Sequence, residues 1–401
     1  MAVINQDFFD FIEKNKDKDP NQLRLALKQK DYNFDLDLAI TQIECRKKAS
    51  GKLKVFLSYP DFLFPDAIST EQSSHQAVAK YHSKLISGRL RVLDMTAGLG
   101  IDAMSFAQKG ARVTAIELNP LKAEILQINA GNLDLSKLQT VEGDSIEYLK
   151  NTDFQYDLIF VDPSRRGDTN KRLYNLRDCS PDVLNNQEIL LQHSDKVLIK
   201  ASPLLDLTQT LKDFQNIAAI RTIGVKGECK ELLIELDSNR ENREIIIEAI
   251  NLDNDGNILS EFSDELRNQE TQVVEYATEK ELTSEMFILE PSAMVMKLQP
   301  WNSICRKFNA KKLGKSSHIF LTTQPPEKFP GRVTKLKKII KKQDRKTLSG
   351  IPASVISRNH PLSSEEIRKS FKLKEGDQNF IYATRLGEKP IMFLTEKFQN
   401  L

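Results

Sequence analysis

The amino-acid sequence predicts an α/β fold centred on a seven-stranded, mostly parallel sheet with a reversed edge strand. Two observations lead to this prediction. From residue 90 to about residue 240, short apolar runs alternate with amphipathic stretches, a pattern typical of parallel sheets covered by helices on both faces. The last two apolar runs have only residues 224–230 between them, too few for a crossover helix, so they should form an antiparallel hairpin.

The elements around this sheet follow from the same periodicities. Residues 1–88 have apolar residues at helical spacing, with breaks at Pro20 and Asn33, and predict a helical region. The seven strands are expected at residues 91–94, 112–117, 138–142, 156–161, 196–200, 217–222 and 231–236.

The remainder of the chain predicts further α+β structure. Strands are expected at residues 244–251, 271–277 and 286–289, and helices near 258–267 and 293–309. Ser363 and Glu366 form a capping box that predicts the start of a helix. A hairpin of residues 379–385 and 390–395 should turn at Gly387.

The composition indicates a globular protein. With 401 residues, 40% of them hydrophobic and 28% charged, the chain is long enough for two or three domains. No apolar run approaches the roughly 20 residues that cross a bilayer, and residues 1–7 do not resemble a secretory signal. The four cysteines are far apart and no histidines have metal-ligand spacing. We therefore expect a cytoplasmic protein with no membrane segment, disulfide or metal.

The charges are segregated although the net charge is only +2. Acids outnumber bases 17 to 4 between residues 231 and 290, whereas residues 328–346 hold nine bases and one acid. The basic segment predicts either a polyanion-binding face or a solvated surface, and both readings stay open. Its candidate phosphate-binding residues are Lys335, Lys337, Lys338, Lys341 and Lys342.

The most informative motif follows the first predicted strand. Its apolar run ends at Asp94, a tight turn is expected at Gly98 and Gly100, and a helical pattern starts at once. A turn of this kind lets a nucleotide-type cofactor approach the bare backbone. By itself the turn is ambiguous, because Gly98, Gly100 and Ala103 also satisfy the dinucleotide fingerprint.

Acidic residues end the second and third predicted strands. A carboxylate at Glu117 can accept hydrogen bonds from both ribose hydroxyls, and one at Asp144 can accept from an adenine amine. Each of them could equally cap the helix that follows. Because the carboxyl ends of parallel strands meet at one edge of the sheet, the combined set favours an adenosyl group over a pyrophosphate cofactor.

The fourth predicted strand leads into the sequence Asp162-Pro163-Ser164-Arg165-Arg166. Proline fixes its own φ and restrains its neighbour, so the backbone at this strand end should be rigid. Asp162 and nearby carbonyl groups could then hold an amine toward a methyl donor, which is catalysis by proximity and orientation. Arg165 and Arg166 suit a phosphate or a developing negative charge. An ordinary turn is the other reading.

These motifs resemble class I S-adenosylmethionine-dependent methyltransferases, whose Rossmann-like sheet is closed by one reversed strand. The likeness covers residues 71–236 and is closest to a bacterial group with an N-terminal helical region and C-terminal ferredoxin-like and THUMP-like units. The core also resembles the trimethylguanosine synthase type of RNA methyltransferase. The matching motifs are Glu71-Gln-Ser73-Ser74, Leu93-Asp94-x-Thr96-x-Gly98-Leu-Gly100-x-Asp102 and Asp162-Pro-Ser-Arg165-Arg166.

The resemblance implies roles for individual residues. Asp162, Pro163 and Ser164 would place the methyl acceptor, and Arg165 and Arg166 would bind substrate. Two residues depart from the commonest pattern: Thr96 stands at a glycine position, and Ser164 replaces a second proline with no aromatic after it. S-adenosylmethionine would be bound by Ser73, Ser74, Asp94, Thr96, Ala97, Gly98, Gly100, Glu117, Leu118, Asp144 and Ser145.

The resemblance also implies a domain order and a substrate. It predicts a helical region (1–88), a methyltransferase domain (89–240), a ferredoxin-like domain (241–325) and a THUMP-like domain (326–401). THUMP domains deliver RNA, so we expect methylation of a base nitrogen in a structured RNA such as tRNA or rRNA. The alternatives are a protein side chain or small metabolite as acceptor, a non-catalytic RNA-binding relative, and a nucleotide-dependent oxidoreductase.

A few other residues have ambiguous signals. Lys200, at the end of the fifth predicted strand, could line the acceptor pocket or be a surface lysine. His75 is expected near the cofactor because it follows Ser73 and Ser74. His82, His193, His318 and His360 are expected to be surface or packing residues.

Overall fold

The computed structural model describes residues 4–27, 31–86, 90–165, 175–240, 244–266 and 274–398. The chain forms two compact units. Unit 1 comprises Met1–Lys226, Lys230–Arg243 and Leu252–Asn257, and unit 2 comprises Gly227–Cys229, Glu244–Asn251 and Ile258–Leu401. The expected division into four domains is finer than this, and its boundaries stay a prediction.

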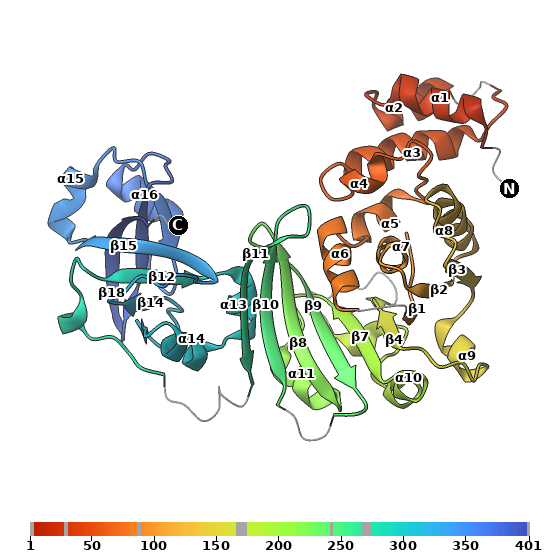
Figure 1. Cartoon of the computed structure of the whole chain (residues 1–401). Coiled ribbons are helices and arrows are strands. Elements are labelled where there is room, and N and C mark those ends of the chain that lie inside the picture. The colour runs from red at the N-terminus through yellow and green to blue at the C-terminus, as the bar shows by residue number, and fades with distance from the viewer. Residues whose placement is uncertain are drawn as a thin grey trace. The chain divides into compact units, whose positions relative to one another are not determined.

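Unit 1 is built on the expected sheet (Figure 1). The strand order is β8-β9-β7-β4-β1-β2-β3, in which β1, β2, β3, β4 and β7 are parallel and β9 is antiparallel to β7. This arrangement confirms the predicted fold, although the reversed strand lies between β7 and β8 instead of being the outermost strand. The strands are β1 (Arg91–Asp94), β2 (Arg112–Glu117), β3 (Leu138–Glu142), β4 (Leu158–Val161), β7 (Lys196–Ala201), β8 (Ile217–Val225) and β9 (Glu228–Asp237).

Helices precede the sheet and connect its strands. The expected breaks are confirmed, since a helix begins at Pro20 and another follows Asn33. The N-terminal helices are α1 (Gln6–Asn15), α2 (Pro20–Leu27), α3 (Leu36–Ala49), α4 (Lys54–Leu57), α5 (Ala67–Gln72) and α6 (Gln76–Lys84). The connecting helices are α7 (Ile101–Gln108), α8 (Pro120–Asn132), α9 (Ser145–Lys150), α10 (Gln187–His193) and α11 (Leu207–Asp213). A short ribbon pairs β5 (Ser164–Arg165) with β6 (Cys179–Ser180) next to the turn η1 (Leu176–Asp178).

Two buried amides fasten the N-terminal helices to the sheet domain. The side chain of Gln42 in α3 exchanges two 2.8 Å hydrogen bonds with the backbone of Phe64. Asn129 in α8 makes the same pair of bonds, also 2.8 Å, with the backbone of Leu63. Both amides are fully buried, so solvent cannot take over the hydrogen bonds that they make to the loop between α4 and α5. The loop is therefore fixed in its path toward the sheet edge.

A buried histidine connects three elements of unit 1. His82 in α6 is fully buried, with Nδ1 2.8 Å from Asp102 in α7 and Nε2 2.5 Å from Glu231 in β9. Burial alone would lower the pKa of His82, but the charges of Glu231 and Asp102 outweigh it and raise the pKa to about 10. At neutral pH the imidazole is therefore a cation shared by two carboxylates.

Unit 2 begins with the neighbouring strands β10 (Ile246–Leu252) and β11 (Ile258–Glu265) and continues with a seven-stranded sheet. The sheet order is β13-β14-β12-β15-β18-β17-β16. Its strands are β12 (Phe287–Pro291), β13 (Lys311–Lys312), β14 (Phe320–Thr322), β15 (Gly331–Ile339), β16 (Ser354–Ser357), β17 (Asn379–Leu386) and β18 (Lys389–Lys397). The helices and 3₁₀ turns are η2 (Glu279–Glu281), α13 (Ala293–Leu298), α14 (Trp301–Lys307), η3 (Lys342–Asp344), α15 (Arg345–Leu348) and α16 (Ser364–Phe371).

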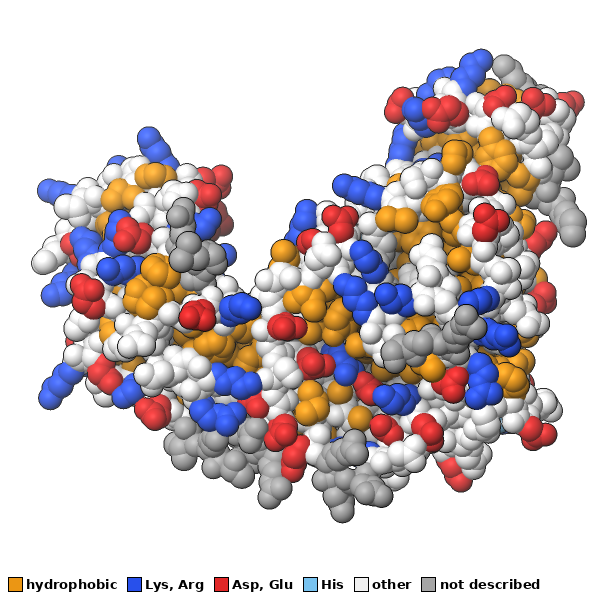
Figure 2. All heavy atoms as spheres, in the orientation of Figure 1, with side chains coloured by type: hydrophobic (Ala, Val, Ile, Leu, Met, Phe, Trp, Pro, Cys, Tyr) orange, Lys and Arg blue, Asp and Glu red, His pale blue; other side chains and the backbone are white. Residues whose placement is uncertain are grey.

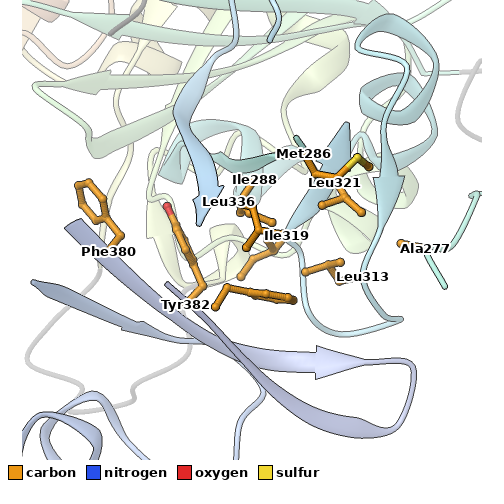
Figure 3. Packing of buried hydrophobic residues seen from close by; sticks show 10 residues of the cluster. Ala277, Met286, Ile288, Leu313, Ile319, Leu321, Leu336, Phe380 and Tyr382 are labelled. Carbon is orange, nitrogen blue, oxygen red and sulfur yellow. The ribbon is translucent and has the colours of Figure 1, made fainter. Parts of the chain in front are cut away.

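The core of this sheet is apolar. Figure 3 shows Ile288, Leu321 and Leu336 converging with Tyr382 between the strands. The capping box at Ser363 and Glu366 is formed by both of its hydrogen bonds and starts α16, as predicted. The hairpin of β17 and β18 is also confirmed.

The expected helix at 258–267 was wrong, because residues 258–265 form β11, and residue 267 lies outside the described residues. Ile258, Leu259 and Phe262 have helical spacing, but only Phe262 is buried. The chain reverses directly before them, where the Asp253 carboxylate accepts hydrogen bonds from the backbone of Asp255 and Asn257. The reversal returns the chain beside β10, where it pairs as a strand.

Two other elements of unit 2 differ from expectation. The predicted helix at 293–309 is divided into α13 and α14, because Gln299 has a φ of +54° and Pro300 follows it. For the predicted strand at 271–277, residues 271–273 lie outside the described residues, and Tyr276 makes an isolated bridge to Lys312. None of the helices that the structure describes combines the length and the hydropathy needed to span a membrane.

The amide of Asn129 should contribute strongly to the stability of unit 1. Asn129→Ala leaves the buried N–H and C=O of Leu63 without partners, so we expect the free energy of unfolding to fall by about 3 kcal/mol. Urea unfolding followed by circular dichroism measures the change. The control is Asn132→Ala, which removes an exposed hydrogen bond to Asp61 and should cost less than about 1 kcal/mol. Equal effects of the two variants would contradict this role.

His82 makes stability depend on alkaline pH. The unfolded pKa is about 6.5, so the stabilisation by protonated His82 is fully present below that pH and is lost as pH rises through about 10. His82→Gln should cost about 3 kcal/mol near pH 6 and flatten the loss of stability between about pH 7 and 10. Urea unfolding at a series of pH values tests this. His193→Gln, at a histidine bonded to a backbone carbonyl, should keep the wild-type slope.

Candidate functional site

A cavity of about 330 Å³ lies at the carboxyl ends of the central strands of unit 1. The cavity brings together residues from α5, from the turns after β1, β2 and β3, and from the end of β4. The sequence-predicted residues that line it are Ser73, Ser74, Thr96, Ala97, Gly98, Gly100, Glu117, Leu118, Asp144, Ser145, Asp162 and Ser164.

The glycine turn after β1 is held between two neighbouring strands. The backbone N–H of Met95 donates to Phe160 in β4, and that of Ala97 donates to Ile116 in β2. Gly98 and Gly100 have φ values of +54° and +83°, a conformation that side chains rarely adopt. A Cβ on Gly100 would also lie 2.1 Å from a methyl group of Leu126 in α8. The turn therefore requires glycine and exposes its backbone to the cavity.

Glu117 and Asp144 line the cavity and also accept hydrogen bonds from the backbone. The carboxylate of Glu117 accepts 2.8 Å hydrogen bonds from the backbone N–H groups of Gly98 and Asn119, which fixes it beside the turn. Asp144 caps α9 through Oδ1, which accepts from the backbone of Ile146 and Glu147. The capping leaves Oδ2 of Asp144 for a ligand. Asp144 can therefore cap α9 and still accept a hydrogen bond from an adenine amine.

Asp94 lies behind the turn and is not part of the cavity wall. Its side chain is 1% exposed, and its Oδ1 accepts a 3.1 Å hydrogen bond from the backbone of Thr96. Burial, assisted by the negative charge of Asp102, raises the pKa of Asp94 to about 8. Asp94 therefore supports the turn from within the protein, and its expected contact with the cofactor stays a prediction.

Asp162 is positioned by two contacts. Its backbone N–H donates a 2.7 Å hydrogen bond to the hydroxyl of Thr96, so the residue that replaces the usual glycine joins the turns after β1 and β4. Its Oδ2 lies 2.6 Å from the ammonium of Lys200 at the end of β7. The side chain of Asp162 is 38% exposed, whereas that of Lys200 is only 12% exposed. Asp162 thus faces the cavity and Lys200 lies beneath it.

Lys200 connects the cavity to the buried histidine. Its ammonium also donates a 3.0 Å hydrogen bond to Ser74, and the Ser74 hydroxyl donates to Asp102. Burial alone would lower the pKa of Lys200, but the charges of Asp162, Glu231 and Asp102 hold it above its usual value. Burial raises the pKa of Asp162, and the ammonium of Lys200 opposes that shift. A continuous polar network therefore runs from the cavity wall to His82.

The remaining predicted acceptor residues are only partly described. Pro163 is buried, and Ser164 is exposed on the cavity wall. The side chain of Arg165 and the whole of Arg166 lie outside the described residues. Ser180 and Pro181, next to β6, complete the wall beside Ser164.

The predicted basic segment includes β15 and the turn after it, and three of its five candidate lysines are paired with carboxylates. Acidic and basic side chains are interspersed on the face of unit 2 seen in Figure 2. Lys341 is exposed, and the side chain of Lys342 is outside the described residues. The paired lysines are Lys335 with Glu285 at 3.8 Å, Lys337 with Glu396 at 2.8 Å, and Lys338 with Asp344 at 2.9 Å.

Sequence reasoning underestimated two residues of the site. Lys200 had a usable signal, since it ends an apolar strand at the ligand-binding edge of the sheet. His82 had none, because its partners lie 20 and 149 residues away in the chain. Among the described residues, no group of three or more His, Cys, Asp or Glu side chains is arranged to hold a metal ion.

Models of known families match three segments of the chain. Residues 20–171 match a family provisionally described as SAM-dependent methyltransferases. Residues 287–330 match a ferredoxin-like domain, and residues 329–397 match a THUMP domain-like family.

Solved structures and curated proteins agree with these models. A crystal structure from Porphyromonas gingivalis W83, provisionally described as a methyltransferase, has a TM-score of 0.84 and 25% identity, with 100% of both chains covered. Ribosomal RNA small subunit methyltransferase J of Shewanella amazonensis is 35% identical over 22% of this chain. The same enzyme of Alkalilimnicola ehrlichii is 38% identical over 22% of this chain. Each match spans only 39% of the curated relative's length.

The fold, the cavity and the comparisons agree. The reversed strand β9 and the glycine turn with its two carboxylates are the features expected for an S-adenosylmethionine site. The family models extend the agreement to both C-terminal segments. Residues 20–171 are therefore similar to S-adenosylmethionine-dependent methyltransferases, and the C-terminal segments are similar to ferredoxin-like and THUMP-like domains.

Proposed function

We propose that this methyltransferase transfers the methyl group of S-adenosylmethionine to a nitrogen atom of a base in RNA. The observation that carries the proposal is the position of Asp162, which opens on the cavity beside the glycine turn and is held by Thr96 and Lys200. The rRNA methyltransferases among the relatives and the THUMP domain-like segment support RNA as the substrate.

The cavity wall offers a complementary group for each part of S-adenosylmethionine. The glycine backbone at Gly98 and Gly100 leaves room for the methionyl portion, near the hydroxyls of Ser73 and Ser74. Glu117 can accept from the ribose hydroxyls. Asp144 can accept from the adenine amine, and the side chain of Leu118, which is 68% exposed, can cover the adenine ring. The bound cofactor supplies an electrophilic methyl group.

Asp162 is suited to hold the methyl acceptor. Lys200 occupies Oδ2 of Asp162, so Oδ1 remains to accept a hydrogen bond from an N–H of the base. This bond would orient the nitrogen lone pair toward the methyl donor, and it would strengthen as positive charge develops on the nitrogen. The buried ammonium of Lys200 fixes the carboxylate in this orientation.

A carboxylate held in this way would also accept an N–H from a protein side chain or a small amine. The discriminating experiment incubates the enzyme with labelled S-adenosylmethionine and separate RNA, protein and metabolite fractions. Label in RNA supports the proposal, and label confined to either of the other fractions overturns it.

Glu117 and Asp144 should determine cofactor affinity. Glu117→Ala removes an acceptor of two charge-assisted hydrogen bonds, so we expect the Kd for S-adenosylmethionine to rise about 50-fold. Asp144→Asn keeps a side-chain oxygen for the helix cap but removes the charge, and should raise the Kd about fivefold. Isothermal titration calorimetry measures both. Glu142→Gln changes an exposed residue of β3 outside the cavity lining and should bind normally. Normal binding by Glu117→Ala would exclude the assigned role.

Asp162 should affect turnover far more than cofactor binding. Asp162→Ala removes the acceptor-orienting oxygen, so we expect kcat to fall at least about 100-fold while the Kd for S-adenosylmethionine changes less than about threefold. The matched control is Asp157→Asn, which removes a charge at the opposite end of β4 that is paired with Arg91. Thermal unfolding of each variant reports whether the fold is retained. A folded Asp162→Ala variant with wild-type kcat would contradict the assignment.

A further inference from the structure

Unit 2 contains a second cavity, of about 750 Å³, that the methyl-transfer site does not use. Three of its four charged lining residues are cations. The charged residues are Glu290 on β12, Arg332 on β15, Arg358 after β16 and Lys397 at the end of β18. The lining therefore has a net charge of +2, which favours an anionic ligand.

One buried carboxylate fixes both arginines. Glu290, whose side chain is 10% exposed, accepts a 2.9 Å hydrogen bond from Arg332 and a 2.8 Å hydrogen bond from Arg358. The hydroxyl of Tyr382 donates to the same carboxylate at 3.2 Å. The Arg332 and Arg358 side chains nevertheless remain 45% and 33% exposed. Their guanidinium groups are thus held in place while part of each stays open to the cavity.

Aromatic rings lie beside these cations. The guanidinium of Arg332 is 4.6 Å from the centre of the Phe380 ring, so one of its faces is covered. An arginine plane supported in this way can stack a nucleobase on its other face. Phe398 also lines the cavity and packs edge-on against Phe287, with ring centres 4.9 Å apart.

Gly331 allows the two sides of this wall to approach closely. A Cβ at this position would lie 2.1 Å from the backbone carbonyl oxygen of Glu290 and 2.7 Å from the ring of Phe329. A larger residue would separate β15 from β12 at the point where Arg332 reaches Glu290. The arrangement of the cavity therefore depends on a glycine beside the arginine.

We propose that this cavity binds a nucleotide unit of single-stranded RNA, with the phosphate on Arg358 and Lys397 and the base stacked on Arg332. Planar guanidinium donors match phosphate oxygens, and a stacking face distinguishes a nucleotide from an acidic peptide. The inference rests on the proposed RNA substrate and gives it a contact site distinct from the lysines of β15, of which Lys335, Lys337 and Lys338 are paired with carboxylates.

The test is equilibrium binding of a fluorescein-labelled oligouridylate of about twelve nucleotides to the full chain, followed by anisotropy. Lys397→Gln should weaken binding about fivefold and reduce the salt slope by about 0.7 between about 50 and 200 mM KCl. Arg332→Lys keeps the charge opposite Glu290 but loses the stacking plane, and should weaken binding about tenfold with an unchanged slope.

Lys389→Gln is the matched control. Lys389 starts the same strand as Lys397, its side chain is 83% exposed, and it does not line the cavity. Its removal should leave binding within about twofold of the wild type. Equal binding by wild type, Lys397→Gln and Arg332→Lys would overturn the proposal. A second outcome would also overturn it: displacement of the labelled oligonucleotide by polyglutamate of equal charge at the same concentration as unlabelled RNA.

Measurements on the same wild-type and variant proteins test this inference and the proposed function separately. Cofactor binding is measured by calorimetry and methyl transfer by label incorporation into RNA. Loss of oligonucleotide binding in the cavity variants, with cofactor affinity retained, supports the cavity. If the wild type binds RNA through the cavity but methylates only protein or metabolites, the proposed function fails and the cavity stands. If the variants methylate RNA with unchanged KM and bind it normally, the cavity inference fails alone.

Discussion

The ion pairs of His82 with Asp102 and Glu231 support the architecture of the proposed methyl-transfer site. Charges removed from water are costly unless they are paired and hydrogen-bonded, so the imidazolium and its two carboxylates fix one another's positions. Asp102 is the second residue of α7, directly after the glycine turn, and Glu231 belongs to the reversed strand. The helix that follows the cofactor turn is therefore anchored by charge as well as by packing.

The same buried charges extend to the proposed reacting centre. Ser74 and Lys200 continue the hydrogen-bonded network from Asp102 to Asp162, which faces the cavity. A carboxylate on a flexible loop could adopt many orientations, but one held by a buried ammonium has few. An oriented carboxylate would be the main requirement for catalysis, since the methyl donor is already electrophilic when bound. The stability of unit 1 and the geometry of Asp162 therefore have a common origin.

The sequence was most informative where structure depends on neighbouring residues. The bounds of β1, β2 and β3 agree with their apolar runs, and the glycine turn was recognisable because Gly98 and Gly100 must adopt positive φ. Structure that depends on residues far apart in the chain could not be predicted from local sequence patterns. Nothing local to Ile258 and Leu259 shows that an aspartate-stabilised turn returns them beside β10. Equally, a run of lysines does not show that acids such as Glu396 will lie opposite them.

The hydrogen bond from the backbone of Asp162 to the hydroxyl of Thr96 has a thermodynamic consequence. Thr96 belongs to the turn that would carry the methyl donor, and Asp162 belongs to the turn that would carry the acceptor. Movement of either turn changes the geometry of this bond, so ligands at the two turns would not bind to independent surfaces. Such coupling is reciprocal: whatever free energy the donor contributes to acceptor binding, the acceptor contributes equally to donor binding. Through this one hydroxyl, the proposed donor and acceptor sites would each affect the affinity of the other.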